Sequence, residues 1–203
     1  RQFRSKQSGR YGTTVTDAAF MTSRDGVAFH RWGEAFIRPG PATKDTWVYG
    51  DNFIFWGMVQ TKSHLEGAAD DISLYATEGY WQGESTSFRR YTLRQDGFVS
   101  ATAGWKGGRL QTKPVIFHGT QLELNFATSA AGSIRVEIQD SDGKPLEGYS
   151  LADCPEIFGD TIARSVAWKD DSKDVSLLAG KPVRLLFELK DADLYSFRFG
   201  GDE

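Results

Sequence analysis

The chain has 203 residues, a formal net charge of -3 and a pI near 5.7. This length can bury a hydrophobic core, and without a basic stripe along the body we expect no nucleic-acid partner. No apolar run approaches the ~20 residues that span a bilayer, so we also expect no membrane partner. Basic side chains gather near the start, where we expect residues 1–16 to be a flexible N-terminal segment.

The next part of the chain, residues 17–87, reads as a small number of strands. A short strand, a tight turn at "SRDG" (23–26) and a second strand make up residues 20–37, because Asp-Gly supplies the positive φ that hairpin turns require. The segment "NFIFWGMVQT" (52–61) is apolar on both faces, which predicts a central position in a sheet. The polar stretch "QGESTS" (82–87) predicts a domain boundary.

Residues 88–203 show alternation of apolar and polar residues, which predicts strands with one buried and one solvent-facing side. The segments are 88–93, "QLELNF" (121–126), "SIRVEIQD" (133–140), "PVRLLFEL" (182–189) and "LYSFRF" (194–199). Turns are expected at Asp96-Gly97, Gly107-Gly108, Ala131-Gly132 and Asp142-Gly143. We therefore predict an all-β protein: an antiparallel β-sandwich or jelly roll preceded by strands of an incomplete propeller blade, with less than about a tenth of its residues in helix.

The stretch "DAAFMTSRDGVAFHRWGEAFIRPG" (17–40) resembles a blade of the five-bladed β-propellers of invertase-like and arabinanase-like glycosidases. The matching residues are Ser23 to Gly26, Phe29 and Trp32. Residues 71–103 resemble the last blade of such proteins and its junction with an appended β-sandwich. The segments "GSIRVEIQDSDGKPLEGYS" and "GKPVRLLFELKDADLYSFRF" resemble that sandwich.

The resemblance implies the C-terminal portion of a longer glycoside hydrolase-like protein acting on carbohydrate. Only about one blade is present, so the partner of residues 17–87 would be missing upstream blades or a second copy of the chain. In that clan the catalytic carboxylates come mainly from earlier blades, so we expect this chain alone to lack the pair. An extracellular or periplasmic location is compatible with the resemblance, and the residues themselves do not fix the compartment.

Two clusters combine aromatic rings with carboxylates, which suits sugar binding because rings pack on sugar faces and carboxylates accept hydroxyl hydrogen bonds. The predicted substrate-binding residues are Trp47, Tyr49, Asp51, Glu78, Tyr80 and Trp81. Asp51 and Glu78 are also the candidates for catalytic carboxylates. The alternative interpretation is that the rings form the core of the blade and the acids lie in turns.

Other residues offer little chemistry. Asp140 and Asp142 mimic half of a calcium loop, but Leu151 occupies the twelfth position, so we predict an ordinary turn. Asp170, Asp171 and Asp174 could join a structural calcium site, and no other cofactor is expected. His30, His64 and His118 lack metal-ligand spacing. Cys154, the single cysteine, excludes an internal disulfide and is expected to be a small buried residue.

Two hypotheses therefore stand for the function, beside a third option, an interaction domain with no sugar affinity. In the first, the chain is the C-terminal part of a glycoside hydrolase, with the sandwich as an accessory domain. In the second, it is a non-catalytic carbohydrate-binding or structural β-sandwich module.

Overall fold

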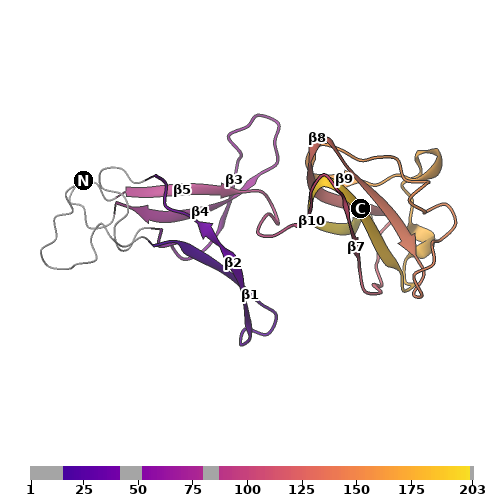
Figure 1. Ribbon diagram of the computed structural model, residues 1–203, viewed down its shortest axis with the longest axis horizontal. Helices are drawn as coiled ribbons and strands as arrows, with labels where there is room; N and C mark the ends of the chain where they lie inside the picture. The colour runs from indigo at the N-terminus through magenta and orange to yellow at the C-terminus, as the bar shows by residue number, and fades with distance from the viewer. Residues whose placement is uncertain (1–15, 42–51, 80–86, 202–203) are drawn as a thin grey trace, which may run out of the picture. The chain divides into compact units, whose positions relative to one another are not determined.

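The computed structural model describes residues 16–41, 52–79 and 87–201. The chain divides into two compact units, residues 1–93 and 94–203. The sheets are antiparallel throughout the described ranges, as Figure 1 shows. The predicted all-β, antiparallel, sandwich-like class is therefore confirmed. The predicted basic segment 1–16 lies almost entirely outside the described residues.

The first unit begins with a hairpin of β1 (Ala18–Ser23) and β2 (Phe29–Ile37). The turn between them is held by its own side chains. The Ser23 hydroxyl accepts a hydrogen bond from the Gly26 amide (2.9 Å), and the Asp25 carboxylate accepts from the amides of Val27 and Ala28. Gly26 has φ of 73°, as an Asp-Gly turn requires. The predicted hairpin is confirmed.

A three-stranded sheet completes the described part of the first unit, in the order β3 (Val59–Thr61), β4 (Asp71–Glu78) and β5 (Ser87–Leu93). The polar stretch before residue 88 predicts that residues 88–93 belong to the second domain. The backbone of β5 instead pairs with β4 along its whole length. The first unit therefore includes this strand and ends at Leu93. Whether it belongs to a propeller stays a prediction.

The apolar segment 52–61 is not the buried central strand that we expected. It contributes one isolated bridge, Ile54 to Ala76, and the short edge strand β3. Trp56 is fully exposed, and the other exposed large side chains here are Phe53, Ile54, Phe55, Met58 and Val59. An apolar run with no alternation does not say which element covers it. The Phe55 ring meets Phe88 of β5 edge-on, yet both side chains stay exposed. Packing of this unit on another body stays a prediction.

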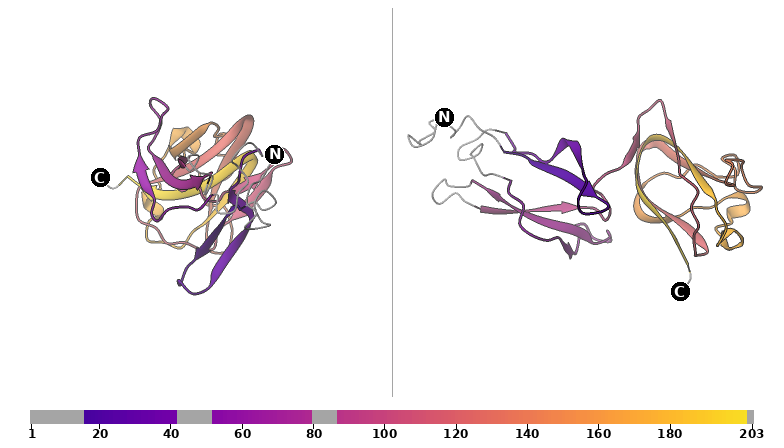
Figure 2. Two further views of the ribbon diagram at one scale, coloured as in Figure 1. Left: turned by 90° about the vertical axis from the view of Figure 1, so that its left-hand side faces the viewer. Right: turned by 90° about the horizontal axis from the view of Figure 1, so that it is seen from below.

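The second unit is one curled five-stranded sheet. Its path runs β6 (Ala101–Ala103), β10 (Arg184–Gly200), β8 (Gln121–Gln139) and β9 (Asp160–Ser165). A further strand, β7 (Gly108–Gln111), also pairs with β10. Figures 1 and 2 show β8 and β10 as long arcs that curve around the interior of the unit. The sandwich-like core thus comes from a sheet that folds over on itself.

Two long strands replace what we predicted as four shorter ones. The sequence predicts a turn at Ala131-Gly132 between two strands. Instead β8, which is 19 residues long, runs through this point without ending. A Cβ on Gly132 would lie 2.8 Å from the Lys190 carbonyl oxygen and closer still to that of Asp191. Asp191, with φ of 44°, bends β10 at the same level. The glycine therefore permits close backbone approach at a bend in a strand.

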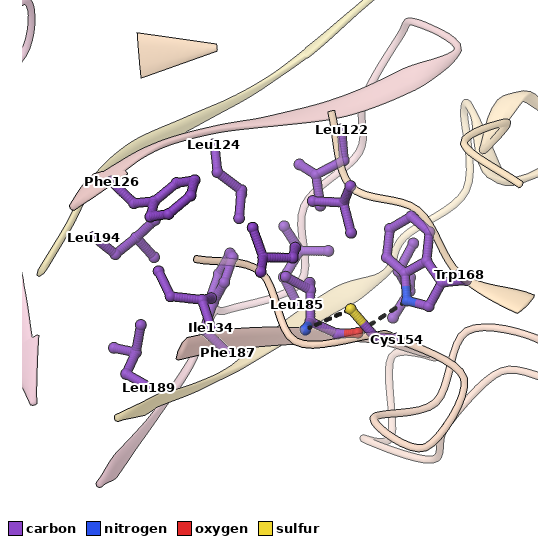
Figure 3. Packing of buried hydrophobic residues seen from close by; sticks show 14 of the residues in the cluster. Leu122, Leu124, Phe126, Ile134, Cys154, Trp168, Leu185, Phe187, Leu189 and Leu194 are labelled. Carbon is purple, nitrogen blue, oxygen red and sulfur yellow. Dashed lines mark hydrogen bonds between the residues drawn. The ribbon is translucent and has the colours of Figure 1, made fainter. Parts of the chain in front are cut away.

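The core of the second unit lies on the concave side of this sheet (Figure 3). The fully buried alternating residues are Leu122, Leu124, Phe126, Ile134, Val136, Ile138, Leu185 and Phe187. Trp168 packs at one end, where its indole N–H donates to the Val136 carbonyl at 2.9 Å and its ring meets Tyr149 edge-on. The predicted inward faces of these strands are confirmed.

The opposite face of β8 departs from the alternation rule. Glu137 and Gln139, expected to face solvent, are buried. The Gln139 amide donates to Glu137 at 2.8 Å, the Leu151 backbone amide donates to the other oxygen of Glu137, and Gln111 donates to Gln139. The turn around Leu151 covers this end of the strand and supplies the donors that burial of a carboxylate demands.

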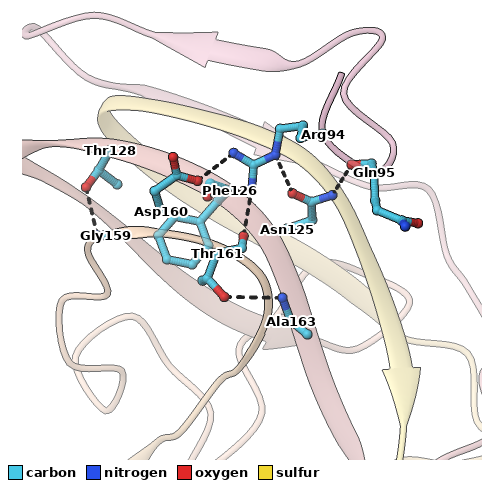
Figure 4. Close-up of polar contacts among 9 residues, drawn as sticks. All are labelled: Arg94, Gln95, Asn125, Phe126, Thr128, Gly159, Asp160, Thr161 and Ala163. Carbon is cyan, nitrogen blue, oxygen red and sulfur yellow. Dashed lines mark hydrogen bonds and ion pairs between the residues drawn. The ribbon is translucent and has the colours of Figure 1, made fainter. Parts of the chain in front are cut away.

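Arg94, the first residue of the second unit, ties its entry segment to the sheet (Figure 4). Its guanidinium donates to Asn125, to Asp160 and to the carbonyl oxygens of Phe126 and Thr161. Asn125 returns a bond to the Gln95 carbonyl at 2.7 Å. The network supplies hydrogen-bond partners to the side chain of Asn125, which lies at a shift in register between β8 and β9. The network therefore has a structural role.

Helical structure in the described ranges consists of two three-residue turns, η2 (Lys169–Asp171) and η3 (Ser176–Leu178). The carboxylate of Asp174, which precedes the N-cap residue Val175, accepts a hydrogen bond from the Ser176 amide at 2.8 Å. Among the described segments, none forms a helix with the length and hydropathy of a membrane span.

Candidate functional site

Of the six predicted sugar-binding residues, Glu78 is the one that the structure describes. Trp47, Tyr49, Asp51, Tyr80 and Trp81 lie outside the described residues. Convergence of the two clusters therefore stays a prediction, as does the pairing of Asp51 with Glu78.

Glu78 ends β4, where it faces β5. One carboxylate oxygen accepts hydrogen bonds from the Arg89 guanidinium at 2.5 Å and from the Tyr91 hydroxyl at 2.9 Å. The side chain of Glu78 is 29% exposed, whereas that of Arg89 is 60% exposed. Alternation on β5 places Arg89 and Tyr91 on the same face, two residues apart, so both reach the same carboxylate.

These contacts favour the ionised form of Glu78. The hydrogen bond from Arg89 lowers the pKa of the carboxyl, and the Tyr91 hydroxyl and the Arg89 charge add to this against an opposing effect of burial. A general acid at neutral pH needs the reverse shift, a raised pKa. The described surroundings of Glu78 therefore suit a carboxylate that accepts hydrogen bonds, as in the predicted binding role, better than a proton donor.

Two of the residues considered for metal or thiol chemistry, Asp140 and Cys154, make structural contacts. Asp140 accepts from the amides of Asp142 and Lys144, closing the predicted turn. Within the described ranges, no group of three or more His, Cys, Asp or Glu side chains converges on a point. Cys154 is buried, as expected, and accepts from the Val136 amide; burial raises the pKa of its thiol.

A groove of about 510 Å³ opens on the second unit, at a place that the sequence analysis did not select. Its most prominent residue is Trp105, whose surface is 62% exposed. Trp105 and Lys106 are the two central residues of the turn between β6 and β7, closed by a bond from the Gly107 amide to the Gly104 carbonyl. The groove falls in the ~300–1,000 Å³ range typical of small-ligand sites.

The floor of the groove is a row of charged residues across three strands. Glu188 on β10 lies directly opposite Arg109 on β7 and opposite Arg135 on β8. Directly paired residues share one face of a sheet, and this face is opposite to that of the buried Leu189. Arg109 donates twice to Glu188, at 2.9 and 2.6 Å. The row is therefore well ordered, and it faces away from the core.

The sides of the groove come from the loop before β9 and from the residue pair of the sheet that follows the charged row. Glu156 accepts from Arg135 at 3.1 Å. Lys190 pairs with Ser133, two positions along from the charged row, and its ammonium nitrogen lies 4.3 Å from the ring centroid of Trp105. An exposed aromatic surface thus stands beside fixed hydrogen-bonding groups of both charges.

The sequence does carry a signal for this groove. The run "GWKGG" (104–108) places a Trp and a Lys between glycines. A tryptophan in a hairpin turn has no neighbouring strand to cover it, unlike the alternating aromatics that fill the core. The partners on β8 and β10 could not be identified in the same way, because their relevance depends on the register that sets Glu188 opposite two arginines.

No protein-family model matches the chain, and no significant match was found among curated proteins or solved structures. The function is therefore argued from the geometry of the site.

Proposed function

We propose that the second unit is a carbohydrate-binding module and that its site is the groove around Trp105. The observation that carries this proposal is the exposed indole of Trp105 beside a groove with ordered charged side chains. Sugar rings present apolar C–H faces that pack on aromatic rings, and hydroxyl groups that both donate and accept hydrogen bonds. The groove supplies both kinds of contact.

The ordered polar groups fit this role in detail. Arg109 and Glu188 hold each other in place, so little side-chain entropy remains to be lost when a ligand binds. Guanidinium groups donate to sugar hydroxyls, and carboxylates accept from them. Two loops and three strands contribute to the groove, so a ligand there contacts a surface that the sheet itself keeps in shape.

Binding of a panel of neutral and charged oligosaccharides, measured by isothermal titration calorimetry, tests the proposal. Trp105→Ala should weaken binding of any ligand by at least about tenfold, or ~1.4 kcal/mol. Leu177→Ala is the matched control, because Leu177 is an exposed apolar residue of η3 that does not line the groove. Unchanged affinity in Trp105→Ala, or the absence of binding to the whole panel, would overturn the proposal.

The glycoside hydrolase hypothesis stays a prediction. It depends on a carboxylate pair, and of its two named candidates only Glu78 is described, in surroundings that lower its pKa. Turnover of aryl-glycosides by the pure chain, lost in Glu78→Gln, is the result that would favour it.

A further inference from the structure

The groove around Trp105 is positively charged in a protein whose net charge is negative. Its lining includes four cationic side chains, Lys106, Arg109, Arg135 and Lys190, and two anionic ones, Glu156 and Glu188. The chain as a whole has a formal net charge of -3. The excess of two positive charges is therefore a local property of this surface.

The two glutamates balance the charges of the two arginines and leave the charges of the two lysines unbalanced. Glu188 is engaged with Arg109, and Glu156 with Arg135. Each pair is electrically neutral. Arg109 meets Glu188 on the neighbouring strand, and Arg135 meets Glu156 from the loop before β9. The charge that remains belongs to Lys106 and Lys190.

Neither lysine has a carboxylate partner among the described residues. Lys106 lies at the tip of the β6–β7 turn, next to Trp105 in the chain. Lys190 lies over the ring of Trp105, a cation–π contact that at an exposed site is worth only ~0.5–1 kcal/mol. The ammonium group is therefore held near the indole while its hydrogen-bonding capacity stays available to a ligand.

We propose that the groove binds an anionic saccharide, one whose sugar units carry carboxylate or sulfate ester groups. This inference rests on the proposed carbohydrate-binding function and names the ligand class. The sugar ring packs on Trp105, and its anionic group accepts charge-assisted hydrogen bonds from Lys190 and Lys106. The neutral Arg–Glu pairs that line the groove contact the hydroxyl groups.

The test compares three oligosaccharides of equal length by calorimetry with the full chain: a neutral oligogalactose, an oligogalacturonate and a sulfated oligogalactose. We expect at least one of the two anionic probes to bind at least about tenfold more tightly than the neutral one at low ionic strength. The difference should shrink in about 0.5 M salt, since exposed charges are screened there. The two anionic probes distinguish a carboxylate ligand from a sulfate ligand.

Paired variants assign the effect to the groove. Lys106→Gln combined with Lys190→Gln should reduce the affinity for the anionic probe by about tenfold and leave that for the neutral probe within about twofold. Lys144→Gln combined with Lys173→Gln removes the same charge from exposed positions outside the groove and should change neither.

Each other outcome has a definite meaning. Equal binding of neutral and anionic probes, with Trp105→Ala weakening both, overturns the inference and leaves the proposed function in place. Equal losses in the two double variants show diffuse attraction of polyanions and also overturn it. If none of the three probes binds, the inference fails, and the proposed function fails with it when the whole oligosaccharide panel also shows no binding.

Discussion

Lys190 holds its ammonium nitrogen 4.3 Å from the ring centroid of Trp105, across the boundary between β10 and the β6–β7 turn. One face of β10 lines the core. On its other face, Lys190 contacts the exposed β6–β7 turn. It is small in energy, because both partners are accessible to solvent. Its position is what matters: it keeps a cation beside the most exposed aromatic surface of the groove.

Replacement of either of these two residues should have little effect on the stability of the fold. Trp105→Ala and Lys190→Gln should each alter the free energy of unfolding by no more than about 1 kcal/mol, since neither side chain is part of the core. Urea unfolding followed by circular dichroism measures this. A loss of several kcal/mol in either variant would mean that the pair supports the fold, and binding losses could not then be attributed to the groove.

Trp168 should behave in the opposite way. Trp168→Phe removes the bond from the indole N–H to the Val136 carbonyl and leaves that acceptor unpaired in the core. We expect the second unit to lose about 2 kcal/mol, the usual range for an unsatisfied buried group together with lost packing. Trp56→Phe, at a fully exposed position, is the control and should change stability by less than about 0.5 kcal/mol. Similar effects in both variants would contradict the described packing.

Gly132 should resist replacement by alanine. A Cβ there meets the carbonyl oxygens of Lys190 and Asp191, so β10 must shift or the bend must open. Gly132→Ala is expected to lower the thermal unfolding temperature by several degrees, corresponding to about 1–3 kcal/mol. Gly104→Ala, where a Cβ meets nothing within 4 Å, is the matched control. Equal melting temperatures for the two variants would show that the strands do not approach each other at this point.

The carboxyl of Glu78 should titrate below the ~4.3 of an unfolded glutamate. Arg89 stabilises the ionised form, so Glu78 contributes stability above the unfolded pKa that is lost as the pH falls through the lower folded pKa. Carbon-13 NMR of the side-chain carboxyl measures the midpoint. Arg89→Gln should move it upward, whereas Arg31→Gln, on β2 of the same unit, should not. A midpoint well above ~4.3 in the unaltered chain would restore Glu78 as a candidate general acid.

The sequence predicted the parts of the fold that depend on local patterns. Alternation placed Leu122, Ile134 and Leu185 inward, and Asp-Gly pairs placed the turns at Gly26 and Gly143. It did not predict that β8 and β10 pass through bends, because Gly132 is equally suited to a turn and to a close approach between strands. That choice depends on β10, which lies more than fifty residues further along the chain.

The candidate site was harder to predict than the fold. Aromatic residues beside carboxylates pointed to the segments around Asp51 and Glu78. The groove instead combines the β6–β7 turn and the loop at Glu156 with three strands, two of them distant from the turn in sequence. Local sequence places Trp105 at a turn, but the row of Arg109, Glu188 and Arg135 exists only through strand register. Burial was also predicted wrongly in the first unit: the apolar run that contains Trp56 suggests a buried strand, and Trp56 is fully exposed.

The central claim, that the groove around Trp105 binds carbohydrate, is tested most directly by NMR titration of the isotope-labelled full chain with the tightest-binding oligosaccharide. Our account predicts that the largest shift changes occur at the indole N–H of Trp105 and at backbone amides of residues 107–109 and 188–190. Changes confined to other surfaces, such as the strand end at Glu78, or no changes at saturating ligand would contradict it.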